Sequence, residues 1–349
     1  MKEVFTMWKS TKMIVLTALT AAIYAAILIP FKAIPLVPGF TEVRPGNMIP
    51  VAFGLFFGPA GAWGAAIGNT LGDLFGSTLG VGSLFGFVGN FLFAYVPYKL
   101  WMNLGVLNSN EIESNQGNTK KVILFMICSI LASAACGLFI AWGVDLLGFV
   151  PFSILGTIIP INNAIAACVL GFILTILLFP RIKKWNLFWM DIMPEADIQK
   201  SGPLSRIGAY TMVASLIICL PVALFFAYQI GGTQAPVVMA VAGIGSIGCL
   251  IGGALMKNTR YSISFDFSAT GSEDNSIWIT GLRICTWIVF IAIIITSIVI
   301  GVMIGDSVGI LIVLAGFIIA FLTVAGFMVF LGMAKDIADI RKALCLSKK

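Results

Sequence analysis

The segment that decides the fold is residues 53–76, FGLFFGPAGAWGAAIGNTLGDLFG. Gly58 and Pro59 interrupt an apolar run here. Because proline lacks a backbone N–H and disfavours helix in the residue before it, they predict a turn between two helices. After the turn glycine recurs at every fourth position, at Gly64, Gly68, Gly72 and Gly76. A stripe of small residues at this spacing lets helix backbones approach closely inside a membrane. The segment therefore predicts two consecutive membrane helices, the second packed tightly against a neighbour.

The composition is that of an all-α polytopic membrane protein. Hydrophobic residues make up 59% and charged residues 10% of the 349 residues, with a mean hydropathy of +1.04. A soluble domain carries roughly 25% charged residues, and a membrane helix needs about 20 mostly apolar ones. We expect about ten spans, at residues 12–31, 46–58, 60–78, 80–102, 121–144, 152–180, 207–230, 236–256, 284–304 and 308–332.

The basic residues predict the orientation of these spans. If the N-terminus is cytoplasmic, every lysine and arginine except Lys32 and Arg44 falls on the inner side. Cytoplasmic loops of membrane proteins are enriched in Lys and Arg, so both termini are predicted to be cytoplasmic. This asymmetry also accounts for the net charge of +6, and no nucleic-acid partner is expected.

A polar stretch divides the predicted spans into six and four. Residues 181–206, RIKKWNLFWMDIMPEADIQKSGPLSR, combine proline, glycine and mixed charge in the manner of a cytoplasmic linker. We therefore predict a six-span binding domain, 1–180, and a four-span extension, 207–349. Within the extension, alternating large apolar residues in the loop 257–283 predict a cytoplasmic hairpin.

Polar and aromatic residues converge on the outer ends of the first six spans. Buried polar groups in a membrane are costly unless they have partners, so this convergence predicts a solvated, ligand-binding cavity. The guanidinium suits an anionic group, the tryptophan a heterocycle, and the amides hydrogen bonds. The alternative is structural, because Asn side chains also bridge helices. The candidate ligand-binding residues are Arg44, Asn47, Asn90, Trp142, Asp145, Asn162 and Asn163.

The first span carries a second small-residue stripe. Residues 16–26, LTALTAAIYAA, place Ala18, Ala22 and Ala26 four positions apart. This span, an outer loop, the segment 53–76 and a sixth span that begins PFSILGTIIPINNAIAACVLGFIL together resemble the substrate-specific S component of energy-coupling-factor (ECF) vitamin transporters. The resemblance covers about residues 1–180. S components usually end after six spans, and the four further spans depart from that pattern.

The resemblance implies a substrate-binding subunit that captures a vitamin-like micronutrient at the outer face. Such a subunit works with a transmembrane coupling protein and two ATPases, and its alanine stripe, here Ala18 and Ala22, meets the coupling protein. No G-x-x-x-x-G-K-[ST] loop is present in the sequence, so the ATPases are expected to be separate chains. No enzymatic activity, cofactor or metal is expected.

Two other functions remain open. A secondary transporter driven by an ion gradient usually has carboxylates at mid-membrane, whereas Asp73, Asp145 and Asp306 lie near predicted outer ends. A membrane enzyme is less favoured, because the chain has no histidine and most acid–base and metal sites use one. The polar residues suit many water-soluble vitamins and nucleobase-like precursors, so the substrate is not identified.

Overall fold

The computed structural model describes residues 1–106, 118–198 and 200–260, with scattered helical positions between 286 and 324. Residues Met1–Phe265 form one compact unit and Asp266–Lys349 a second. Most of the predicted spans 284–304 and 308–332 and nearly all of the predicted hairpin 257–283 lie outside the described residues. The fold is therefore described for the first unit.

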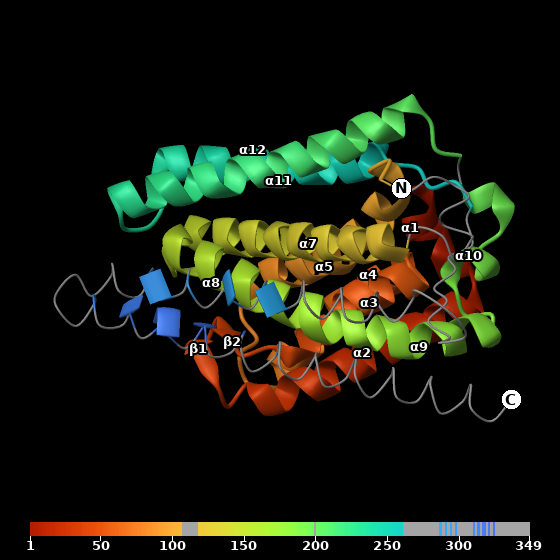
Figure 1. Cartoon of the computed structure of the whole chain (residues 1–349), viewed down its shortest axis with the longest axis horizontal. Helices are drawn as coiled ribbons and strands as arrows, with labels where there is room; N and C mark the ends of the chain where they lie inside the picture. The colour runs from red at the N-terminus through yellow and green to blue at the C-terminus, as the bar shows by residue number, and fades with distance from the viewer. Residues whose placement is uncertain are drawn as a thin grey trace, which may run out of the picture. The chain divides into compact units, whose positions relative to one another are not determined.

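The first unit is built from helices that follow one another through short connections (Figure 1). One two-stranded antiparallel hairpin, in which Pro35 pairs with Glu42, interrupts them. A π-helical segment, Ala166–Gly171, joins α8 to α9, so that the predicted sixth span is one broken helix. The elements are α1 Lys2–Thr6, α2 Thr11–Phe31, β1 Pro35–Val37, β2 Thr41–Glu42, α3 Met48–Phe57, α4 Pro59–Phe75, α5 Gly82–Asn103, α7 Asn118–Leu146, α8 Phe152–Ile165, α9 Phe172–Lys184, α10 Trp189–Ile192, α11 Pro203–Ile230 and α12 Pro236–Leu255.

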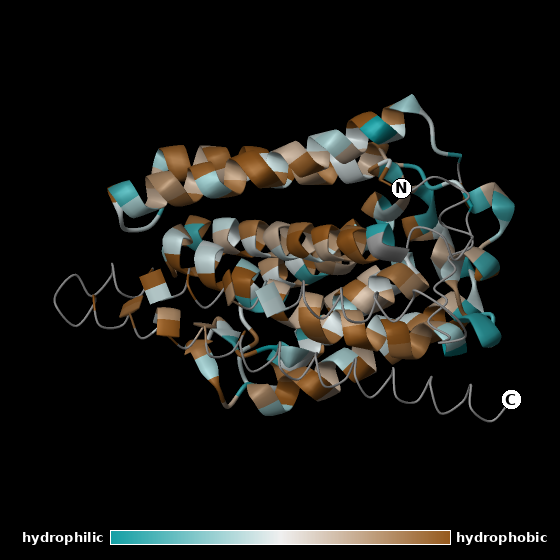
Figure 2. Ribbon diagram, viewed as in Figure 1, coloured by the Kyte–Doolittle hydropathy of each residue, from teal (hydrophilic) through white to brown (hydrophobic). Residues whose placement is uncertain are grey.

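The lengths and composition of these helices confirm an all-α polytopic membrane protein. Among the described residues, five helical segments are long and apolar enough to cross a membrane. Figure 2 shows hydrophobic residues along most of the helix lengths and hydrophilic residues gathered at the end with α1 and α10. The count of ten spans and their orientation stay predictions. The five segments are Thr11–Phe31, Lys120–Leu146, Phe152–Ile192, Pro203–Ile230 and Pro236–Leu255.

The predicted turn between the second and third spans is confirmed. Helix α3 ends at Phe57 and α4 begins at Pro59, where a proline costs little because the first N–H of a helix has no intrahelical partner. Gly58 between them has a φ of +54°, and a Cβ there would lie 2.5 Å from the Trp189 ring. Only glycine satisfies both the backbone conformation and the contact.

The glycine stripe of α4 packs against α2, as predicted. A Cβ at Gly64 would lie 2.4 Å from the Cβ of Thr20, and one at Gly68 would lie 2.8 Å from the backbone oxygen of Ala21. The hydroxyl of Thr20 donates to the backbone oxygen of Leu16 at 2.8 Å, so this polar side chain is satisfied within its own helix. The two backbones therefore approach without an unpaired polar group between them.

Helices α11 and α12 form an antiparallel pair that lies along the same unit (Figure 1). A Cβ at Gly208 would lie 2.6 Å from the backbone oxygen of Gly252, which fixes a close crossing of the pair. A Cβ at Gly243 would lie 3.4 Å from the Trp142 indole of α7. The first two predicted spans of the extension thus pack on the six-span part, and the division into a binding domain and an extension stays a prediction.

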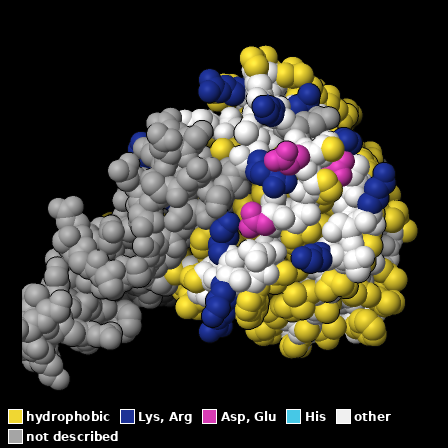
Figure 3. Space-filling model, turned by 90° about the vertical axis from the view of Figure 1, so that its right-hand side faces the viewer, with side chains coloured by type: hydrophobic (Ala, Val, Ile, Leu, Met, Phe, Trp, Pro, Cys, Tyr) yellow, Lys and Arg dark blue, Asp and Glu magenta, His cyan; other side chains and the backbone are white. Residues whose placement is uncertain are grey.

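The end that carries α1 and α10 contains a buried ion pair. The Lys99 ammonium, which is fully buried, pairs with the Glu3 carboxylate at 2.5 Å and donates to the backbone oxygen of Met256 at 2.7 Å. Burial alone would raise the pKa of Glu3, but Lys99 and the N-terminal ammonium outweigh it, and the pKa is lowered. Figure 3 views the molecule from this end, where Lys and Arg side chains gather with a few acidic ones.

Candidate ligand-binding site

A cavity of about 290 Å³ lies beside the β1–β2 hairpin, at the end of the unit opposite α1 and α10. It is bounded by the end of α2, the hairpin, α4, the start of α5, α7 and α8, which are far apart in the sequence. Its polar lining includes Lys32, Arg44, Asn69, Asp73, Thr78 and Ser83. Its apolar lining includes Phe40, Val81, Ile140, Val144, Phe149 and Ile159.

Two cations and two carboxylates meet at one wall of the cavity. Glu42 lies between Arg44, whose Nε is 3.0 Å from Oε1, and Lys32, whose Nζ is 3.3 Å from the same oxygen. Lys32 also pairs with Asp73 at 2.8 Å. Glu42 and Arg44 are buried, and a buried charge is tolerated only when it is paired. The four charges therefore hold one another in place.

The pairing also fixes the charge state of Arg44. Burial by itself lowers the pKa of this guanidinium, but the Glu42 carboxylate more than compensates, and the pKa is raised. Arg44 is thus a permanent cation in the lining of the cavity.

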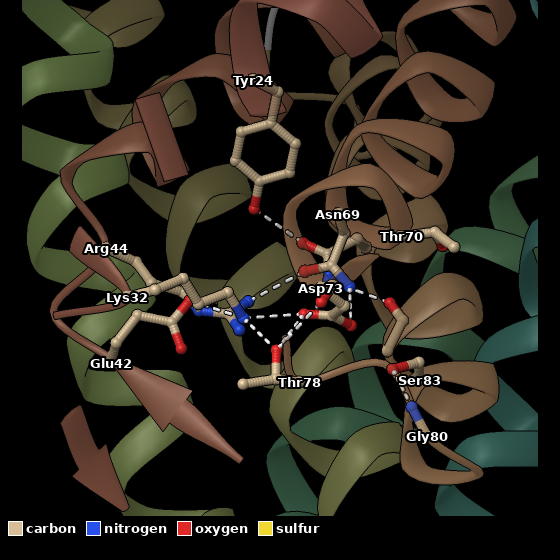
Figure 4. Close-up of polar contacts among 12 residues, drawn as sticks. Tyr24, Lys32, Glu42, Arg44, Asn69, Thr70, Asp73, Thr78, Gly80 and Ser83 are labelled. Atoms are coloured by element: carbon tan, nitrogen blue, oxygen red, sulfur yellow. Dashed lines mark hydrogen bonds and ion pairs between the residues drawn. The ribbon is translucent and has the colours of Figure 1, made fainter. Parts of the chain in front are cut away.

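Asn69 connects this charge group to α4. Its amide oxygen accepts a hydrogen bond from Arg44 Nη1 at 3.0 Å, and its amide nitrogen donates to Asp73 Oδ2 at 3.2 Å. Figure 4 shows Lys32 and Arg44 pointing toward Asn69 and Asp73 across this wall. The sequence prediction omitted Asn69 and Asp73 from the site. Their spacing of four was the available signal, because residues i and i+4 share one face of a helix.

A second, neutral group of polar side chains adjoins the cavity. The Tyr24 hydroxyl lies 2.7 Å from Asn47 Oδ1 and 2.8 Å from Asn90 Oδ1, and its single proton serves one of them at a time. Asn47 donates to Asn163 Oδ1 at 2.5 Å. Asn90 donates to the backbone oxygen of Gly86, which lines the cavity. Three predicted site residues are thus brought together, and Tyr24, which the prediction missed, joins them.

The other predicted site residues contact the chain itself. Asn162 donates to the backbone oxygen of Glu42 at 2.8 Å and so anchors strand β2. Trp142 faces Gly243 of α12. Asp145 accepts hydrogen bonds from the backbone N–H groups of Phe152 at 3.1 Å and Gln234 at 2.7 Å. Of the predicted residues, Arg44 lines the cavity and these three hold the segments around it.

The candidate site falls within the part of the chain that matches a protein-family model. Residues 14–180 match a family model described as QueT transporter. No curated protein and no solved structure matches the chain. Within the described residues, no group of three or more His, Cys, Asp or Glu side chains is placed to hold a metal ion. The match includes the cavity and both polar groups and excludes α1, α11 and α12.

Proposed function

We propose that the chain, whose residues 14–180 match the QueT transporter family model, is a member of that family of ECF S components and serves as the substrate-binding membrane subunit of an ECF importer for a queuosine precursor or a related micronutrient. The protein is a multi-pass protein of the cell membrane. It would capture its ligand at the outer face and depend on a separate coupling protein and two ATPases.

The single observation that carries the proposal is the cavity with its charge group. A volume of about 290 Å³ is near the low end for small-molecule sites, which span roughly 300–1,000 Å³. Lys32 and Arg44 are balanced by Glu42 and Asp73, so the wall offers many donors and acceptors without a large net charge. Such a site favours a small polar heterocycle over a multiply charged ligand.

We assign the residues around the cavity to two roles. Arg44, Asn69 and Asp73 would contact the ligand directly, because they line the cavity. Asn47, Asn90 and Asn163 would support its wall through Tyr24 or exchange their mutual hydrogen bonds for bonds to the ligand.

The face of α2 that points away from the glycine stripe of α4 supports the proposed contact with a coupling protein. Ala18 and Ala22 are exposed, as are Val15 and Leu19 beside them. The two alanines are about 6 Å apart along the helix axis at 1.5 Å per residue, so one crossing helix would cover both. Close packing of small residues drives such contacts in membranes, and Ala18 and Ala22 are the proposed contact with the coupling protein.

Two measurements test this function. Mass spectrometry of the protein purified from cells is expected to find a co-purifying queuosine precursor or similar heterocycle. Uptake is expected only when the coupling protein and both ATPases are co-expressed. Uptake by the chain alone that survives ATP depletion and stops with an ionophore would instead establish an ion-driven secondary transporter.

The coupling contact has its own test. Ala18→Trp or Ala22→Trp is expected to abolish co-purification with the coupling protein and uptake, because the indole prevents close helix approach. Ligand binding to the isolated subunit should persist. Ala240→Trp, at an exposed alanine on α12, is the matched control and should leave the complex intact. Loss of the complex in the control alone would refute the assignment.

A further inference from the structure

Two aromatic rings from separate loops meet at the exposed side of the cavity. Phe40 lies between β1 and β2, and Phe149 lies between α7 and α8; both line the cavity. Their ring centroids are 6.2 Å apart, and Phe149 is 53% exposed. A ligand that passes between the hairpin and the α7–α8 loop would pass these two rings.

The α7–α8 loop is held by the last turn of α7. The backbone N–H of Phe149 donates to the oxygen of Val144 at 3.2 Å, and Gly148 donates to the oxygen of Asp145 at 2.8 Å. The Asp145 carboxylate then accepts the N–H of Phe152 on the far side of the loop. Asp145 thus braces the loop at both of its ends.

The connection between α11 and α12 reaches the same place. The backbone N–H of Gln234 donates to Asp145 Oδ1 at 2.7 Å, and its side-chain amide donates to the backbone oxygen of Leu146 at 3.0 Å. Gln234 has a φ of +60°, a conformation that is uncommon for a residue other than glycine. These two hydrogen bonds hold it there.

A further contact attaches this end of α11 to α8. The Tyr228 hydroxyl lies 2.9 Å from the Thr157 hydroxyl and 3.3 Å from the backbone oxygen of Ser153. The α11–α12 connection is therefore fixed to both helices that flank the Phe149 loop.

We propose that Gln234, acting through Asp145 and Leu146, positions the Phe149 loop as one side of the cavity mouth, so that the α11–α12 pair controls how fast ligand enters and leaves. Gln234 is a positioning residue, since it bonds to the end of α7 beside the loop and does not line the cavity. The inference rests on the proposed function for the identity of the ligand. The α11–α12 pair lies outside the QueT match. The proposal gives this part of the chain a role in substrate access.

The test measures access to the cavity without requiring the ligand. Ile159, a buried residue that lines the cavity, is changed to Cys, and its reaction with a small soluble maleimide is followed by peptide mass spectrometry. Gln234→Gly accepts the positive φ but removes the side-chain hydrogen bond, and it is expected to speed the reaction several-fold. Gln229→Ala, at an exposed glutamine five residues earlier, is the control and should not change the rate.

A double variant separates positioning from general loosening. Phe149→Ala alone should speed the reaction, and adding Gln234→Gly should speed it no further if Gln234 acts through Phe149. Gln234→Asn keeps the backbone conformation, but its side chain is too short to reach the backbone oxygen of Leu146. It should behave like Gln234→Gly, and it keeps the test valid if the glycine variant misfolds. Additive effects, or unchanged rates in both Gln234 variants, would overturn the inference. If the reaction rates are as expected but mass spectrometry finds no queuosine precursor or similar heterocycle, only the proposed substrate is refuted.

Discussion

At the scale of single residues, the cost of burying charge determines how the charged side chains of the site are paired. Glu42 is shared between Lys32 and Arg44, so its carboxylate offsets positive charge on both side chains. Arg44 stood out in the sequence because it is one of two basic residues on the predicted outer side. Asp73 was placed near a predicted outer end but not among the candidate ligand-binding residues, and Asn69 was not singled out, because a helical sequence does not reveal which face meets a hairpin.

Glu42→Gln is expected to destabilise the protein strongly. It leaves the buried Arg44 and the half-buried Lys32 with Asp73 as the carboxylate of the group. Removing one partner of a buried pair costs about 3–5 kcal/mol. Thermal unfolding in detergent measures this. Asp191→Asn, which removes an ion pair with Lys183 that is partly solvent-exposed, is the control and should cost about 1 kcal/mol or less. Equal effects would show that the Glu42 pairs add nothing.

Asn69→Ala is expected to weaken ligand binding. It removes an acceptor for Arg44 and a donor for Asp73 at the cavity wall, and an unmade buried hydrogen bond costs about 1–3 kcal/mol. Affinity for the co-purified ligand should therefore fall roughly five- to 150-fold. Asn103→Ala removes a comparable buried amide at the opposite end of α5 and should leave the affinity unchanged. If both variants bind normally, the cavity is not the ligand site.

At the scale of elements, proline and glycine made the helix positions predictable. The bounds of α2, α4 and α12 lie close to the predicted spans 12–31, 60–78 and 236–256. Helices α1 and α10 and the β1–β2 hairpin were not predicted, because they are too short to carry a periodic pattern. The π-helical segment 166–171 has no sequence signal either, since it continues an apolar helix.

Gly68→Ala is expected to destabilise the α2–α4 contact. A Cβ there would lie 2.8 Å from the backbone oxygen of Ala21, and backbone cannot move aside as a flexible side chain can. Overpacking of this kind costs about 1–3 kcal/mol, which a lower unfolding temperature would report. Gly80→Ala is the matched control, since a Cβ at Gly80 meets nothing within 4 Å. A stable Gly68 variant would mean that the helices can separate freely.

At the scale of the whole molecule, the first two predicted spans of the extension pack against the six-span part. The polar stretch 181–206 suggested a boundary before α11, yet α11 and α12 pack on α7 and α8 within one compact unit. Trp142 and Asp145, which stay predicted ligand contacts, also contact this part of the chain. Polar and aromatic residues at the predicted outer ends have two possible partners, a ligand or another helix, and the partner here comes from about 90 residues further along the chain.

The orientation in the membrane decides whether the cavity captures ligand from outside. The cavity and the β1–β2 hairpin lie at one end of the unit, and α1, α10 and a gathering of basic side chains lie at the other. Because basic residues are retained on the cytoplasmic side, Leu36→Cys in the exposed hairpin should react with a membrane-impermeant maleimide in intact cells. Glu195→Cys, exposed at the opposite end, should react only after the cells are permeabilised. The reverse pattern would place the cavity inside and exclude capture of a micronutrient from the medium, since an importer must meet its substrate on the outer face before coupling to ATPases on the inner one.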